Sequence, residues 1–259
     1  MAARTFSIFD IDGAFAAVLA RARADEAVLG LWLGGSRGKG RPTVHSDYDF
    51  GLVVSDAGLP AWREQIATLP RGLDAALFTR PAFAAYAAWG GPQAWDRYSF
   101  VGIKALVDRP GGIQALIDDK ACIPPDAVSP FIDASLDHFV NQVYRALKCR
   151  RDGDLLASRL EAAQAPQPAL DALFALNGSR LRPYAKYLAW ELETRPLAAS
   201  PWASDALQAL LLDVLSLDPV PALQALLHGL EPLARNAGHG AVLDAWGPAL
   251  PWMTTWRPG

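Results

Sequence analysis

The sequence has very little cysteine. Its 259 residues include only two, Cys122 and Cys149, which stand far apart in unrelated surroundings. A disulfide-stapled scaffold needs several cysteines, and a structural zinc site needs closely spaced cysteines or histidines. We therefore expect two buried, reduced thiols, and neither a disulfide framework nor a zinc site.

Long apolar runs are also missing. No stretch reaches the roughly 18 apolar residues that a membrane-spanning helix needs. Asp10 and Asp12 interrupt the segment in which a secretion signal would be apolar. We therefore expect no membrane span and no export signal, and we expect a cytoplasmic protein.

The chain has no large excess of charge of one sign. Its 24 Lys and Arg residues and 27 Asp and Glu residues give a formal net charge of −3. A protein whose main partner is duplex nucleic acid normally carries a strongly basic surface, so we do not expect such a partner. The slightly acidic balance suits a small cationic molecule instead.

Apolar residues, in contrast, are plentiful. They make up 51% of the chain, which can therefore bury a sizeable core as one large domain or two smaller ones. The 9 tryptophans serve either as core residues or as surfaces on which a flat ligand can stack.

The first part of the chain alternates helical and strand-like patterns, which indicates an α/β or α+β domain. The patterns predict helices over 11–29, 59–69 and 81–89, and strands over 29–33, 48–54, 73–79 and 103–107. Pro124 and Pro125 then mark the natural boundary, and beyond them only helical spacing remains. Each expected helix of this second part ends near a glycine or proline, and these helices cover 132–151, 155–164, 169–176, 184–193, 206–217 and 222–230, the last ending at Pro232.

A glycine-rich turn follows the first expected strand and invites comparison with a P-loop. That motif requires Gly-x4-Gly-Lys-Ser/Thr. The interval from Gly34 to Gly38-Lys39 is one residue too short, and Gly40 stands where the magnesium-binding hydroxyl should be. The turn is therefore not a P-loop.

The same turn satisfies the Gly-x-Ser-x-Gly pattern of a hydrolase nucleophile elbow, with Ser36 at its centre. That elbow needs a sizeable helix directly after the serine, whereas further glycines and a proline follow here. His228 or His239 could complete a triad, although nothing around either marks it. A serine hydrolase stays open as a distant alternative.

A third interpretation uses the whole segment. Asp47 and Asp49 begin the next strand, and alternate residues of a strand point to the same face, so the two carboxylates converge. Carboxylates that close repel each other unless a cation lies between them, and Mg²⁺ prefers carboxylates together with substrate phosphate oxygens. The small residues 34–36 leave backbone N–H groups open to phosphate, with the Ser36 hydroxyl as a further donor. This combination is typical of nucleotidyl transfer.

Gly35-Ser36 followed by Asp47-x-Asp49 resembles the signature of the DNA polymerase β-like nucleotidyltransferase superfamily. The sequence pattern Gly-Arg-Pro-x3-Ser-Asp-x-Asp over 40–49 looks most like that of the antibiotic nucleotidyltransferases, such as the streptomycin/spectinomycin adenylyltransferases. The resemblance covers 11–190. It implies an α+β fold, with a small mixed-sheet nucleotidyltransferase domain over 1–125 and an all-α helix bundle over 126–259.

The resemblance also implies roles for single residues. Asp47 and Asp49 would hold two Mg²⁺ ions. Asp74, the only acid in the expected strand 73–79, would be the third carboxylate, as a metal ligand, a base for the acceptor hydroxyl, or both. In the antibiotic-modifying relatives a glutamate often serves as the base, and this strand has none. Gly35 and Ser36 would bind the nucleotide phosphates.

Two basic segments of the second part are further candidates. Lys148 resembles in placement the phosphate-contacting lysine of related enzymes, and Arg145 shares its helix face. Cations are also favoured at helix C-termini by the helix dipole alone, which is the alternative explanation for these two residues. The segment 177–191 interleaves cations with aromatic residues that could stack a base, although a core with a solvated face explains it equally well.

The expected function is a magnesium-dependent nucleotidyltransferase that moves a nucleoside monophosphate, AMP from ATP or another NTP, to a hydroxyl of a small acceptor and releases pyrophosphate. A protein or nucleic-acid acceptor stays open. The alternatives are a nucleotide-binding regulator or antitoxin on the same fold, and a protein-modifying nucleotidyltransferase.

Overall fold

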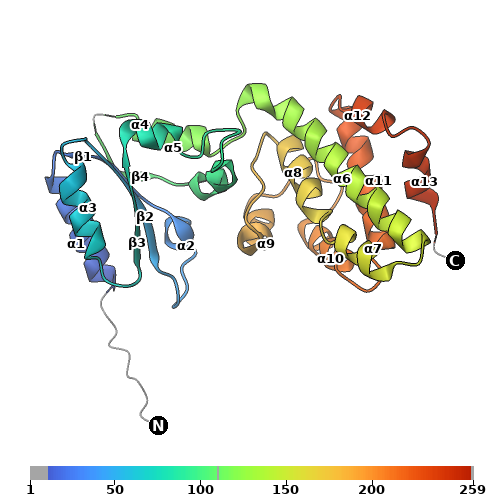
Figure 1. The fold of residues 1–259 in the computed structure, drawn as a ribbon, viewed down its shortest axis with the longest axis horizontal. Helices are drawn as coiled ribbons and strands as arrows, with labels where there is room; N and C mark the ends of the chain where they lie inside the picture. Colours follow the sequence, from blue (N-terminus) through green and yellow to red (C-terminus); the bar gives the residue numbers. More distant parts are fainter. Residues whose placement is uncertain (1–10, 110, 258–259) are drawn as a thin grey trace, which may run out of the picture. The chain divides into compact units, whose positions relative to one another are not determined.

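The chain divides into two compact units, Met1–Cys122 and Ile123–Gly259. The computed structural model describes residues 11–109 and 111–257 (Figure 1). Asp10, one of the two acids behind the expectation of no export signal, lies outside these residues. The first unit contains the whole sheet and the second is helical, so the expected α+β class is confirmed.

A mixed sheet of four strands forms the centre of the first unit, in the order β3-β2-β1-β4. β1 (Val28–Leu33) pairs antiparallel with β2 (Tyr48–Val54) and with β4 (Ala105–Asp108), whereas β2 pairs parallel with β3 (Leu73–Thr79). β1 and β2 are the inner strands of this order, and both consist almost entirely of apolar residues with buried side chains. Burial on both faces favours such continuous apolar runs.

Helices cover both faces of this sheet (Figure 1). α1 (Ile11–Ala24) and α3 (Leu59–Ala67) pack on one face, with Phe15 and Trp62 in its core. α4 (Arg80–Ala85) and α5 (Ile113–Lys120) pack on the other face. α3 makes the crossover from β2 to the parallel strand β3, which no tight turn could connect.

Two glycines make room for tryptophan rings. A Cβ atom at Gly51, in the middle of β2, would overlap the indole of Trp32 on β1, and one at Gly229 would overlap Trp202. Trp32 is buried and stacks on Phe83 at a centroid distance of 4.5 Å. Trp32 therefore serves as a core residue, as one of the two expectations for the tryptophans has it.

A buried arginine fastens the end of the first unit. Arg97, in the 3-10 helix η1 (Ala94–Phe100), is 1% exposed. Its guanidinium donates to the carbonyls of Ala87 at 2.9 Å, Cys122 at 2.8 Å and Asp119. Burial lowers the pKa of this group. Backbone carbonyls take the place of a counter-ion, because they satisfy its donors without a second buried charge.

The second unit is a bundle in which α6 is the longest described helix and packs against both α7 and α8. The described helices are α6 (Val128–Arg151), α7 (Leu155–Ala162), α8 (Pro166–Leu176), α9 (Ala185–Thr194), α10 (Ser204–Val214), α11 (Val220–Asn236), α12 (Gly240–Asp244) and α13 (Ala249–Thr255). Within 11–109 and 111–257, no helix is both long enough and apolar enough to cross a membrane.

The structure corrects the expectations about the end of α11 and about the two thiols. α11 does not stop at Pro232 but continues to Asn236, because its apolar face continues as well: Ala234 is fully buried. Packing of that face compensates for the backbone hydrogen bond that the proline removes. The thiols are not buried either, since Cys122 is exposed and Cys149 half-buried, although both are free cysteines.

The contact between Gly51 and Trp32 predicts a paired mutational effect. Gly51→Ala should lower the free energy of unfolding by about 1–3 kcal/mol, because the added methyl group overlaps the indole. Trp32→Phe should recover part of this loss in the Gly51→Ala background, since the smaller ring leaves space. Urea denaturation of the two single variants and the double variant measures the coupling. Gly51→Ala as stable as the wild type would contradict the packing described.

Candidate metal centre and phosphate-binding turn

Three carboxylates meet at one end of the parallel strand pair. Each of Asp47, Asp49 and Asp74 offers an oxygen, and these oxygens all lie within 4.8 Å of one another. Asp47 immediately precedes β2, Asp49 is in β2, and Asp74 is in β3. Asp47 and Asp74 are exposed and Asp49 is half-buried. The structure thus brings together the three acids that the sequence singled out.

Strand geometry explains this convergence. Asp49 and Asp74 are direct partners in the parallel register, so their side chains lie next to each other on the same face of the sheet. Alternation places Tyr48 and Phe50 on the opposite face, in the core with α1 and α3. The acids therefore belong to the face covered by α4 and α5, beyond the buried part of the strands.

The glycine turn packs directly against Asp49. Gly34 N–H donates to the Asp49 carbonyl at 2.7 Å, and Gly35 begins the short helix α2 (Gly35–Gly38). Gly35 has φ +55°, and a Cβ atom there would overlap Asp49 Oδ2. Only glycine allows the backbone to approach the carboxylate so closely. The hydroxyls of Ser36 and Ser46 lie 3.2 Å apart and join the turn to the residue before Asp47.

The donor set fits a hard divalent cation. Three carboxylates are oxygen ligands of the kind that Mg²⁺ and Mn²⁺ prefer, and their exposure leaves positions for water and for phosphate oxygens. Three negative charges within 4.8 Å repel one another without a cation between them. Asp47, Asp49 and Asp74 are therefore the residues that could hold magnesium here.

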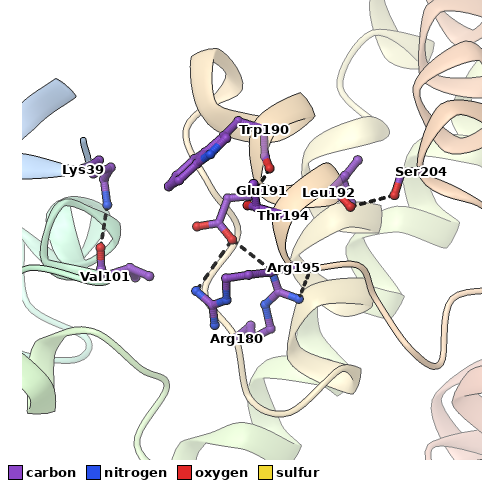
Figure 2. A network of polar contacts seen from close by, with 9 residues as sticks. All are labelled: Lys39, Val101, Arg180, Trp190, Glu191, Leu192, Thr194, Arg195 and Ser204. Atoms are coloured by element: carbon purple, nitrogen blue, oxygen red, sulfur yellow. Dashed lines mark hydrogen bonds and ion pairs between the residues drawn. The ribbon is translucent and has the colours of Figure 1, made fainter. Parts of the chain in front are cut away.

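Lys39, at the end of the turn, is bound to the neighbouring 3-10 helix. Figure 2 shows its ammonium group directed at the Val101 carbonyl, which it meets at 2.8 Å, and it also donates to the Tyr98 carbonyl at 3.2 Å. It lies 4.3 Å from the centroid of the Tyr98 ring. Cations stabilise the carbonyl-rich C-terminal ends of helices, which explains this placement at the end of η1. Lys39 does not belong to a P-loop. It fixes the end of the glycine turn to this helix.

Lys148 lies in the last turn of α6, in the second unit, and is exposed. Arg150 and Arg151 belong to the same turn, and Arg145 forms an ion pair with Glu161. A helix C-terminus attracts such cations by itself. A role for Lys148 in nucleotide binding therefore stays a prediction.

The cations of the segment 177–191 are largely engaged in ion pairs within the second unit. Arg180 donates to Glu191 at 3.0 Å, and Arg195 approaches the same carboxylate at 3.7 Å (Figure 2). Arg182 donates to Asp171 at 2.7 Å, although burial raises the pKa of Asp171 against the effect of this arginine. Glu191 is only 3% exposed, so two arginines neutralise a buried acid. These ion pairs stabilise the second unit, and they explain the arginines of the segment without a role in ligand binding.

The serine-hydrolase alternative gains no support from the surroundings of Ser36. Its described hydrogen bond goes to another hydroxyl, that of Ser46. α2 ends at Gly38, so the sizeable helix of a nucleophile elbow does not follow. His239 pairs with Asp133 at 2.8 Å inside the second unit.

The sequence matches no protein-family model and no curated protein. Among solved structures, it is similar to a nucleotidyltransferase-like protein from Exiguobacterium sibiricum 255-15, with 12% sequence identity and a TM-score of 0.45. The match covers 92% of this chain and 78% of that chain.

The close approach of Gly35 to Asp49 predicts an effect on metal affinity. Gly35→Ala should lower the affinity for Mn²⁺, used in place of Mg²⁺, by about tenfold, because the methyl group displaces the carboxylate. Gly40→Ala is the matched control: Gly40 has φ +67° in the same loop, but a Cβ atom there meets nothing within 4 Å. Both variants carry the cost of alanine at positive φ, about 1 kcal/mol. Electron paramagnetic resonance measures free Mn²⁺, and equal affinities of the two variants would refute the effect.

Proposed function

We propose that the protein is a magnesium-dependent nucleotidyltransferase, which transfers a nucleoside monophosphate from an NTP to a hydroxyl group and releases pyrophosphate. The observation that carries this proposal is the packing of the glycine turn against Asp49 within a cluster of three carboxylates. The turn offers donors for phosphate, and the three carboxylates beside it offer ligands for a cation.

Each part of this arrangement has a task in the transfer. Asp47 and Asp49 hold magnesium, which when bound neutralises the phosphate oxygens and stabilises the charge that develops during transfer. The backbone at Gly35 and the hydroxyl of Ser36 bind the β- and γ-phosphates. This fixes the leaving group in line with the acceptor oxygen, so that positioning supplies a large part of the rate.

The bond changes balance without any further reactant. The acceptor oxygen forms a bond to the α-phosphorus, the bond from that phosphorus to the bridging oxygen breaks, and pyrophosphate leaves. Asp74 is the third ligand for the cation. We also assign its carboxylate as the base that receives the proton of the acceptor hydroxyl. Its exposed carboxylate can pass that proton to water.

We propose a small cationic acceptor. The net charge of −3 suits a small cationic acceptor such as an aminoglycoside, as in the antibiotic nucleotidyltransferases that the sequence resembles. ATP is the nucleotide we propose first. Lys148 is proposed as an additional phosphate contact from the helical unit.

The proposal predicts the position of the label after incubation with nucleotide. With ATP labelled at the α-phosphate, label should move to an acceptor in an aminoglycoside panel while pyrophosphate appears in equal amount. Label on the protein itself would instead favour a protein-modifying enzyme, and binding without turnover a regulator. Release of the γ-phosphate alone would contradict nucleotidyl transfer.

The carboxylates predict how variants behave in the same assay. Asp47→Asn and Asp49→Asn should each lower magnesium-dependent pyrophosphate release by about 100-fold or more, because the cation loses a ligand. Asp74→Asn should lower turnover and change its metal dependence. Asp56→Asn, which removes an exposed carboxylate after the other end of β2, is the control and should keep full activity. Unchanged release by the first two variants would refute the metal site.

A further inference from the structure

Arg37, next to Ser36 in the glycine turn, reaches across to the strand that carries the carboxylates. Its Nε donates to the Ser46 carbonyl at 3.2 Å, and its guanidinium carbon lies 4.0 Å from the centroid of the Tyr48 ring. Its Nη1 lies 3.3 Å from Asp12 Oδ1, which also accepts a hydrogen bond from the Tyr48 hydroxyl at 2.7 Å. One side chain thus connects the turn, β2 and helix α1.

Arg37 contacts the residues on either side of Asp47. Ser46 and Tyr48 are the residues immediately before and after Asp47. Tyr48 is buried on the α1 side of the sheet, where its ring stacks on Phe15 at 4.4 Å. Because neighbouring residues of a strand point to opposite faces, Arg37 contacts β2 from the face that the carboxylates do not occupy. The guanidinium is therefore on the opposite face of β2 from the Asp49 carboxylate.

We propose that Arg37 is a positioning residue for phosphate binding: it holds the backbone of Gly35 and Ser36 against β2 and leaves the contacts with the nucleotide to that backbone. This inference rests on the proposed function. Asp12, in turn, orients Arg37 without any contact with the substrate.

For this role of Arg37, the planar shape of the guanidinium matters more than its charge. The Asp12 side chain is 71% exposed, and an exposed ion pair by itself contributes little. The flat guanidinium can lie over the Tyr48 ring while its Nε donates to the Ser46 carbonyl and its Nη1 forms an ion pair with Asp12, which a lysine ammonium cannot do. Arg37→Lys should therefore fail to replace arginine although it keeps the charge.

Asp12→Ala separates a positioning role from direct phosphate binding, because the two predict opposite signs. If Arg37 bound phosphate itself, the loss of its competing carboxylate would release it and strengthen the binding of Mg·ATP. If Arg37 positions the turn, the loss of one of its anchors loosens the turn and weakens binding. Isothermal titration of the full chain with Mg·ATP measures this sign without any knowledge of the acceptor.

We expect Asp12→Ala and Tyr48→Phe to weaken Mg·ATP binding by about three- to tenfold, and Arg37→Lys by about tenfold. Tyr48→Phe keeps the ring and removes only the hydroxyl, so it tests the network even if another variant fails to fold. Asp56→Ala and Arg63→Lys make the same kinds of change at exposed positions away from the turn and should bind as the wild type does. Melting temperatures close to that of the wild type would show that a general loss of stability is not the cause.

Hydrogen exchange provides a readout that needs no nucleotide. The amides of 34–41 should exchange faster in Asp12→Ala and Arg37→Lys than in the wild type, while those of β1 and β2 stay protected. Unchanged exchange in 34–41, or tighter Mg·ATP binding by Asp12→Ala, would overturn the inference. If the wild type itself bound no Mg·ATP, the proposed function would fail, and the exchange rates would still decide whether Arg37 holds the turn.

Discussion

The parallel pairing of β2 with β3 is the constraint on which the candidate site depends. It places Asp49 opposite Asp74 and brings Asp47 within reach of both. Like charges this close are unfavourable, and burial of the apolar residues that follow Asp49 in β2 helps to hold them together. β2 is almost entirely buried beyond Asp49, so the strand cannot slide to separate the acids without exposing its core residues.

Around this pair, the sheet unit uses its cations in a consistent way. Arg37, Lys39 and Arg97 all donate to backbone carbonyls, and each joins segments that are distant in the sequence. A carbonyl satisfies the donors without the desolvation of a second charged group. The glycine turn is consequently held to β2 by Arg37 and to η1 by Lys39, and the phosphate contacts that we propose fall to its own backbone.

Much of this could be expected from the sequence. The aromatic and β-branched content of 48–54 predicts β2, the expected strand 73–79 coincides with β3, and Asp74 is the only acid of that strand. The register that sets Asp49 opposite Asp74 was not predictable, because parallel pairing is decided by packing with α3 and β1. The role inferred for Arg37 was missed as well, since its contacts with Asp12 and Tyr48 exist only in the folded unit. The feature of the sequence that bears on this role is the alternation of side chains along the strand, which turns Tyr48 away from Asp47 and Asp49. The expected end of α11 at Pro232 is wrong, because helix propensity alone does not show that Ala234 is buried.

The guanidinium of Arg97 also determines how far the sheet unit extends along the chain. Its carbonyl partners come from the segment after α4, from the end of α5 and from Cys122, the last residue of the unit. A chain cut at Lys120 would lack the Cys122 carbonyl, which accepts from both Nε and Nη2 of this 1% exposed cation. The smallest fragment with the complete fold of this unit therefore has to include Cys122, a residue required for its backbone oxygen and not for its thiol.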